Sequence, residues 1–265
     1  MIKWLLGYYR LSLCGLTIGF GGTLLIISSW LPITIKGYHI SMWLLLVIVR
    51  TLLFILNVRV DCTNPDRLRR HHGFIFPNHM TYLDVLALVS ITPLRFLAKD
   101  EVRAMPIIGQ VAKSIGCVFV NRDDKSSRAE ARTKLSQVET FPPVVLFPEG
   151  KRNPGDHLLP FRYGAFEIVI RGQTPFLTCA IEYDQPKIAI WHRGESIIKA
   201  ALRVAAYNKQ IKARLTPLEV VTPTLDDDPV QMSLATHESM TAVLFPESLR
   251  QPTADNSIPA ANSQL

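Results

Sequence analysis

The chain has 265 residues, of which 48% are hydrophobic, and a formal net charge of +7 at pH 7. Residues 1–60 contain five basic and no acidic residues, whereas 24 basic and 22 acidic residues follow from Asp61 onward. Because the excess positive charge flanks apolar segments, it indicates an anionic membrane surface and argues against nucleic acid as a partner. Four widely spaced cysteines without a Cys-x-x-Cys pair match neither a zinc site nor a disulfide framework.

Two apolar segments open the chain. Residues 11–35 are uncharged and long enough to cross a bilayer core of about 30 Å. Residues 40–58 carry Arg50 near their middle, which is costly in lipid unless the side chain finds a partner. Either two helices form a hairpin, or one spanning helix precedes an interfacial one. The hairpin is favoured because it returns the chain to its starting side, where positive-inside residues gather: Lys3, Arg10, Arg59, Arg67, Arg69 and Arg70. Residues 1–60 are therefore expected to anchor the protein in the inner (cytoplasmic) membrane, with the rest on the cytoplasmic side.

Short apolar runs alternate with amphipathic stretches from Asp61 onward. Strands are predicted at residues 73–76, 117–120, 144–147, 176–181, 187–191 and 215–221. Helices are predicted at residues 83–90, 107–115, 125–139, 163–171, 196–207 and 230–244. This alternation predicts an α/β domain over residues 61–250 with a largely parallel central sheet flanked by helices. Residues 251–265 are polar, lack apolar periodicity and are expected to form a disordered tail.

The most informative stretch follows the first of these strands. His79 comes just after the apolar run at 73–76, and Asp84 follows five residues later. On an unbroken helix this spacing rotates the side chains by about 500°, nearly to opposite faces, so the chain must bend between them. If Thr81 caps the next helix, Asp84 can fold back to fix the tautomer of His79. The pattern predicts a general base with its orienting carboxylate. A turn histidine and a helix N-terminal aspartate without catalytic role would have the same sequence.

Two further strand ends carry residues suited to binding an anion. Arg122 follows the predicted strand at 117–120, and the run Glu149-Gly150-Lys151-Arg152 follows the strand at 144–147. Because functional groups gather at the carboxyl ends of parallel strands, both ends are expected near His79. Arginine presents a planar fork to phosphate, lysine adds a point charge, and a glycine lets the backbone approach a ligand. A solvated strand-end arginine and a plain turn glycine are the alternatives.

Together these residues make the chain resemble the glycerolipid acyltransferase family, in particular the bacterial 1-acylglycerol-3-phosphate (lysophosphatidic acid) acyltransferases. That family is marked by four blocks in fixed order: Asn-His-x-x-x-x-Asp, Gly-x-x-Phe-[Val/Ile]-x-Arg, Phe-Pro-Glu-Gly-[Thr/Lys]-Arg and a proline-containing hydrophobic strand. The corresponding stretches here are residues 78–84, 116–122, 147–152 and 174–180. The resemblance covers roughly residues 60–225.

The resemblance implies a membrane-bound enzyme of phospholipid biosynthesis. It would move a fatty acyl group from an acyl carrier protein or coenzyme A thioester to the hydroxyl of 1-acylglycerol-3-phosphate, forming phosphatidic acid. His79 would accept the hydroxyl proton and Asp84 would orient it. The implied substrate-binding residues are Asn78, Gly116, Arg122, Glu149, Gly150, Lys151 and Arg152. No metal or other cofactor is implied, and the partners are the acyl donor, the lysophospholipid acceptor and the membrane.

Departures from the family pattern leave the acceptor open. Many members have a second proline where this chain has Thr178, and a serine where it has Asn153. An O-acyltransferase acting on another lysolipid, such as lyso-ornithine lipid, is therefore an alternative. Less favoured are a serine hydrolase using Ser114, whose surroundings lack the first glycine of a nucleophile elbow, and a non-enzymatic membrane protein. A metal site using His71, His72 and His79 is weaker still.

Overall fold

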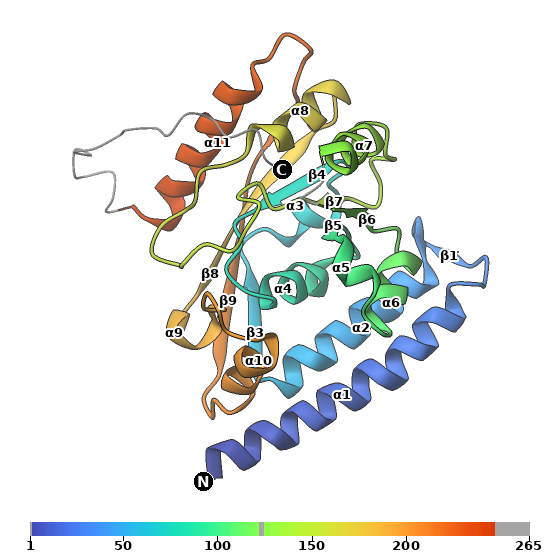
Figure 1. Ribbon diagram of the computed structural model, residues 1–265, viewed down its shortest axis with the longest axis vertical. Helices are drawn as coiled ribbons and strands as arrows, with labels where there is room; N and C mark the ends of the chain where they lie inside the picture. The colour runs from blue at the N-terminus through green and yellow to red at the C-terminus, as the bar shows by residue number, and fades with distance from the viewer. Residues whose placement is uncertain (1, 122–124, 247–265) are drawn as a thin grey trace.

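The computed structural model describes residues 2–121 and 125–246, and within them a seven-stranded sheet forms the centre of the protein (Figure 1). Its strand order is β3-β9-β8-β4-β7-β5-β6. The strands are β3 (Val58–Cys62), β4 (Phe74–Pro77), β5 (Arg95–Lys99), β6 (Val118–Val120), β7 (Val144–Val145), β8 (Phe176–Tyr183) and β9 (Ile211–Val221). Strand β9 runs antiparallel to β8 and parallel to β3, and the remaining neighbours pair parallel. The predicted α/β architecture with a largely parallel sheet is confirmed.

Helices cover both faces of this sheet. The longer ones after the amino-terminal segment are α4 (Leu83–Ile91), α6 (Ile108–Ser114), α7 (Lys125–Ser136), α8 (Tyr163–Arg171), α10 (Ile197–Ala205) and α11 (Pro229–Leu244). Short helices α3 (Pro65–Arg69), α5 (Asp100–Arg103) and α9 (Pro186–Ala189) lie in the connections.

Successive side chains of a strand point to opposite faces, so the buried strands feed two separate hydrophobic clusters. In β4, Ile75 packs with α2, α4 and α10, whereas Phe74 and Phe76 pack with α7, α8 and α11. Both faces of β4 are therefore buried against apolar side chains, and polar side chains lie beyond the ends of the strand.

The amino-terminal segment forms an antiparallel helical pair along one side of the domain (Figure 1). Helix α1 (Ile2–Ser28) connects through the two-residue strands β1 (Thr34–Ile35) and β2 (Tyr38–His39) to α2 (Ile40–Ile55). Helix α2 packs on α4, and α1 contacts α2, α10 and α6. Arg50 donates from Nε to the carbonyl oxygen of Ser90 at 2.9 Å, at the last turn of α4. This contact supplies the partner that a central arginine needs.

Within the described residues, one helix, over Lys3–Ser28, is long and apolar enough to cross a bilayer. Helix α2 has 16 residues and is about 24 Å long, shorter than the hydrocarbon core of about 30 Å. Strand β3 begins before and ends after the predicted boundary between residues 60 and 61, so the amino-terminal segment runs directly into the sheet.

The prediction of a strand at residues 187–191 is wrong. Helix α9 (Pro186–Ala189) occupies this stretch, and the chain then loops back over the end of the sheet. Pro186 lies at the first turn of the helix, where its missing N–H and fixed φ favour a helical start. Ala189 and Ile190 are buried against the end of the sheet, which satisfies the apolar pattern without a strand.

Two strands of the seven-stranded sheet are absent from the predictions. Strand β3 follows α2 after only Leu56 and Asn57 and includes the charged residues Arg59 and Asp61, and β5 has the charged residues Arg95 and Lys99 at its ends. Each pairs with partners distant in sequence, β9 for β3 and both β6 and β7 for β5. The local sequence pattern predicts such strands poorly, because contacts with distant strands stabilise them. The predicted tail at 251–265 lies outside the described residues.

Candidate active site

His79 lies in the turn that joins the carboxyl end of β4 to α4, and this turn brings it against Asp84. Asp84 Oδ2 accepts a hydrogen bond from His79 Nδ1 at 2.8 Å. The chain bends between the two residues as the spacing predicts. The side chain of Asp84 is fully buried, whereas that of His79 is 21% exposed. No hydrogen bond from His79 Nε2 to a described residue is present, so this nitrogen faces the accessible side of the site.

Four donors surround the Asp84 carboxylate. Besides His79, Oδ2 accepts from the backbone N–H groups of Met80 at 2.6 Å and Thr81 at 2.9 Å. Oδ1 accepts from the hydroxyl of Tyr183 at 2.8 Å. Burial, followed by the neighbouring Asp84 charge, raises the pKa of Tyr183 well above its usual value, so the phenol remains a donor. All four partners of Asp84 donate hydrogen bonds, which suits a carboxylate because an ionised carboxylate accepts hydrogen bonds and donates none.

Glu149 holds the backbone of His79 from the next strand. Its Oε1 accepts from the His79 backbone N–H at 2.8 Å and from Asn153 Nδ2 at 2.9 Å, and its Oε2 accepts from the N–H of Leu159 at 2.8 Å. Asn153 donates its own N–H to the carbonyl oxygen of His79 at 2.7 Å. Burial raises the pKa of Glu149 to about 7, although the three donors act in the opposite direction. The geometry makes Glu149 and Asn153 positioning residues, and direct contact of Glu149 with substrate stays a prediction.

The imidazole plane of His79 is also supported from the side. The ring of Phe147 stacks on it with centroids 4.1 Å apart and an interplanar angle of 26°. Asn78 is buried and bonds both backbone groups of Ile181, accepting from its N–H at 2.7 Å and donating to its oxygen at 3.0 Å. Asn78 therefore extends the pairing of β4 with β8 beyond Pro77, and its predicted contact with substrate stays a prediction.

Arg152 reaches the same end of the sheet. Its guanidinium carbon lies 3.7 Å from the ring centroid of Trp191, and its Nε is buried without a hydrogen-bond partner among the described residues. Burial lowers the pKa of Arg152, and the Asp84 charge opposes that shift. The arrangement leaves a partly desolvated cation near Asp84.

The remaining predicted residues differ in position. Lys151 is exposed, and Gly150 has a φ of +70° at a position where a Cβ would lie 2.4 Å from Arg162 Nε. Gly116, with a φ of +75°, precedes β6 and lies beside Arg95, at the opposite end of the strand from the carboxyl edge. Substrate contacts of these three residues stay predictions. Arg122 lies outside the described residues.

Tyr183 and Trp191 belong to this site but carry no local signal in the sequence. Tyr183 is the last residue of β8 and lies 99 positions from Asp84 in the chain. Trp191 falls in the stretch that was predicted to be a strand. Only the pairing of β8 beside β4 and the returning loop after α9 bring the two side chains to His79.

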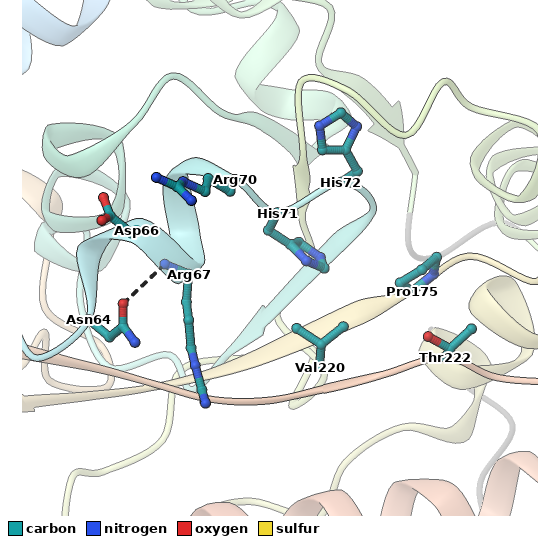
Figure 2. A pocket seen from close by; sticks show the side chains of 9 residues that line it. All are labelled: Asn64, Asp66, Arg67, Arg70, His71, His72, Pro175, Val220 and Thr222. Carbon is teal, nitrogen blue, oxygen red and sulfur yellow. Dashed lines mark hydrogen bonds between the residues drawn. The ribbon is translucent and has the colours of Figure 1, made fainter.

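A basic hollow lies at the other end of β4 (Figure 2). Its lining consists of Asn64, Asp66, Arg67, Arg70, His71, His72, Pro175, Val220 and Thr222. His71 is buried with Nε2 at 2.8 Å from the carbonyl oxygen of Phe74, and Arg67 contacts the oxygen of Leu218 and the carboxylate of Glu219. The strand separates this hollow from His79, so His71 and His72 do not lie with His79 and Asp84.

Comparisons with known proteins find similarity to acyltransferases. Residues 59–182 match the family model described as Acyltransferase, so this part of the chain is similar to that family. It is similar to the 1-acyl-sn-glycerol-3-phosphate acyltransferase of Neisseria meningitidis, with 27% identity over 51% of this chain and 53% of the relative. It is also similar to the lyso-ornithine lipid O-acyltransferase of Rhodobacter capsulatus, with 32% identity over 45% of this chain and 43% of the relative. The matches therefore span about half the length of these relatives.

One solved structure has the same fold over nearly its full length. The 1-acyl-sn-glycerophosphate (LPA) acyltransferase PlsC from Thermotoga maritima superimposes with a TM-score of 0.70, covering 95% of this chain and 97% of that chain. Its sequence identity is 20%, so the likeness establishes a common fold.

Proposed function

We propose that this protein transfers a fatty acyl group from an acyl carrier protein or coenzyme A thioester to the free hydroxyl of a lysolipid. The proposed acceptor is 1-acylglycerol-3-phosphate and the product is phosphatidic acid. The observation that carries this proposal is the 2.8 Å contact between His79 Nδ1 and Asp84 Oδ2, which leaves Nε2 without a described hydrogen-bond partner, together with Arg152, whose Nε is buried with no partner among the described residues.

The reaction follows from this geometry. His79 donates its Nδ1 proton to the hydrogen bond with Asp84, so the Nε2 lone pair can accept the proton of the acceptor hydroxyl. The hydroxyl oxygen attacks the thioester carbonyl carbon, the carbon–sulfur bond breaks, and the proton on Nε2 passes to the departing thiolate. A thioester is already activated, so no covalent enzyme intermediate is required.

The direct test is to offer purified protein several lysolipids with each thioester donor and to identify the products by mass spectrometry. Phosphatidic acid formed from 1-acylglycerol-3-phosphate supports the proposal. Thioester hydrolysis at the same rate with and without lysolipid contradicts it and would favour a hydrolase. Because relatives include a lyso-ornithine lipid O-acyltransferase, lyso-ornithine lipid is the second acceptor to offer.

Arg152→Ala is expected to raise the KM for 1-acylglycerol-3-phosphate about 10- to 100-fold, because a charge-assisted hydrogen bond contributes about 1.5–3 kcal/mol. The KM for the thioester should change much less. Steady-state kinetics with each substrate varied in turn measures this difference. The matched control is Arg193→Ala, which removes an exposed arginine two residues after Trp191. An unchanged acceptor KM, or equal rates with neutral and phosphorylated lysolipids in the wild type, rejects Arg152 as the phosphate contact. Arg122 keeps the same predicted role.

We further propose that the outer face of α1 holds the protein on the cytoplasmic side of the inner membrane, with residues 1–60 as the anchor and residues 61–250 as the acyltransferase domain. Arg10 donates to the carbonyl oxygens of Ala205 and Tyr207, which ties α1 to the end of α10. Leu16 and Phe20, one helical turn apart on α1, are 70% and 74% exposed. The proposed acceptor and product are both membrane lipids, so this attachment would raise their effective concentration at the protein.

The double variant Leu16→Gln/Phe20→Gln is expected to lower partitioning into anionic phospholipid vesicles by at least about 100-fold. Burying each apolar side chain contributes about 1.5–3 kcal/mol, and both are already exposed, so folding should not suffer. Vesicle co-sedimentation measures the effect. Leu225→Gln, at a 64% exposed leucine between β9 and α11, is the control. Unchanged partitioning of the double variant would show that this face does not contact lipid.

A further inference from the structure

The loop after α9 is attached to the catalytic turn. Trp191 donates its backbone N–H to the carbonyl oxygen of Met80 at 3.2 Å, one residue after His79. Its ring also meets the edge of Tyr82, with centroids 6.3 Å apart and planes at 71°. The indole therefore has a defined place relative to the catalytic pair, although it lies more than a hundred residues later in the chain.

The indole is fixed at its far edge as well. Trp191 Nε1 donates to the carbonyl oxygen of Glu195 at 2.8 Å. The Glu195 carboxylate accepts from Arg203 Nη1 at 2.8 and 3.0 Å, and Arg203 also donates to the backbone oxygens of Ile188 and Ile190. Arg203 belongs to α10, so a helix of the domain holds both ends of this loop. The ring cannot rotate freely and presents one face in a fixed direction.

That face is occupied by Arg152. The guanidinium carbon lies 3.7 Å from the ring centroid, closer than the limit of about 6 Å for a cation–π contact. Arg152 makes no ion pair with a described carboxylate, and its Nε is buried without a partner. Stacking on the indole holds one face of the guanidinium and leaves the N–H groups along its edge uncovered by the ring. A guanidinium binds an anion through these in-plane N–H groups.

We propose that Trp191 is a positioning residue for the acceptor, which holds Arg152 in the orientation that receives an anionic headgroup beside His79. This inference rests on the proposed acyl transfer to a phosphorylated lysolipid and names a residue that sets its specificity. Glu195 and Arg203 act through Trp191 by keeping the indole in place. Because the proposed contact orients only the group that receives the acceptor headgroup, its loss should affect acceptor binding and spare donor binding.

The test compares Trp191→Leu, which removes the aromatic face, with Trp191→Phe, which keeps one. Trp191→Leu should raise the KM for 1-acylglycerol-3-phosphate by about 3- to 30-fold, the range expected of a partly desolvated cation–π contact. The thioester KM and kcat should stay within about 2-fold of the wild type, and Trp191→Phe should recover most of the loss. Trp43→Leu is the control, because Trp43 Nε1 also donates to a backbone oxygen, that of Ile35 at 3.0 Å, within the amino-terminal segment.

A double-mutant cycle separates positioning from general packing. In the Arg152→Ala background, Trp191→Leu should produce no further increase in acceptor KM, since the side chain that it positions is gone. Independent, multiplicative effects would overturn the inference, as would an unchanged acceptor KM for Trp191→Leu or an equal effect of Trp43→Leu.

Binding of 1-acylglycerol-3-phosphate without donor, measured by calorimetry in detergent, gives a readout that does not depend on turnover. Trp191→Leu should weaken this binding by the same factor as the KM. A wild type that binds the lipid but transfers no acyl group contradicts the proposed function while still testing Trp191. Wild-type protein that does not bind the lipid overturns both proposals.

Discussion

His79→Ala is expected to reduce turnover about 100- to 10,000-fold, because it removes the group that accepts the hydroxyl proton. The side chain lies at the partly exposed edge of the site, where among the described residues its ring stacks only on Phe147, so the fold and membrane attachment should persist. Acyl transfer measured by product formation, together with circular dichroism and thermal unfolding, distinguishes loss of chemistry from loss of structure. Near-normal rates in a folded preparation would reject His79 as the base.

A second histidine supplies the control for this experiment. His157 Nδ1 lies 2.7 Å from Asp156 Oδ1, but both side chains are largely exposed. His157→Ala therefore removes a histidine–aspartate contact of similar length, 2.7 Å against 2.8 Å, at an exposed carboxylate. Its turnover should match the wild type, since an exposed pair of this kind contributes little and orients no reacting group.

Asp84→Asn is the second substitution with a large expected effect. Asp84 accepts three hydrogen bonds at Oδ2 and one at Oδ1, and an amide can accept at only one of its two polar atoms, so at least one buried donor loses its acceptor. Turnover should fall by about 100-fold or more because His79 loses its fixed tautomer. Stability should fall by about 1–3 kcal/mol because buried donors are left unsatisfied.

Kinetics and thermal unfolding measured on the same preparations test both parts of this prediction. Tyr183→Phe removes only one of the four donors and leaves the contact between Asp84 and His79, so its effects should be smaller than those of Asp84→Asn. Asp156→Asn serves as the exposed control. If Asp84→Asn keeps full activity while losing stability, Asp84 has a structural role and does not orient the base.

The sequence contains enough information to predict the turn at His79. A buried strand, a proline and a spacing that no single helix can satisfy lead to a bend in which Asp84 returns to His79, and the 2.8 Å contact has this geometry. The helix at Tyr163–Arg171 is predicted with the same bounds that the structure has. These features depend on neighbours in the chain, whose geometry is set by backbone dihedral preferences and short-range sterics.

The roles of Glu149, Tyr183 and Trp191 were decided by the tertiary structure. Glu149 has the pattern of a ligand-binding carboxylate, yet three protein donors occupy it because β7 lies next to β4. Tyr183 and Trp191 reach the site only through the pairing of β8 and the loop held by Arg203. Local periodicity reports which face of an element is buried. A buried charge such as Asp84 is hydrogen-bonded by groups that are distant in the sequence. The identity of these groups depends on the order of the strands and on the path of the loops, which are set by the packing of the whole chain.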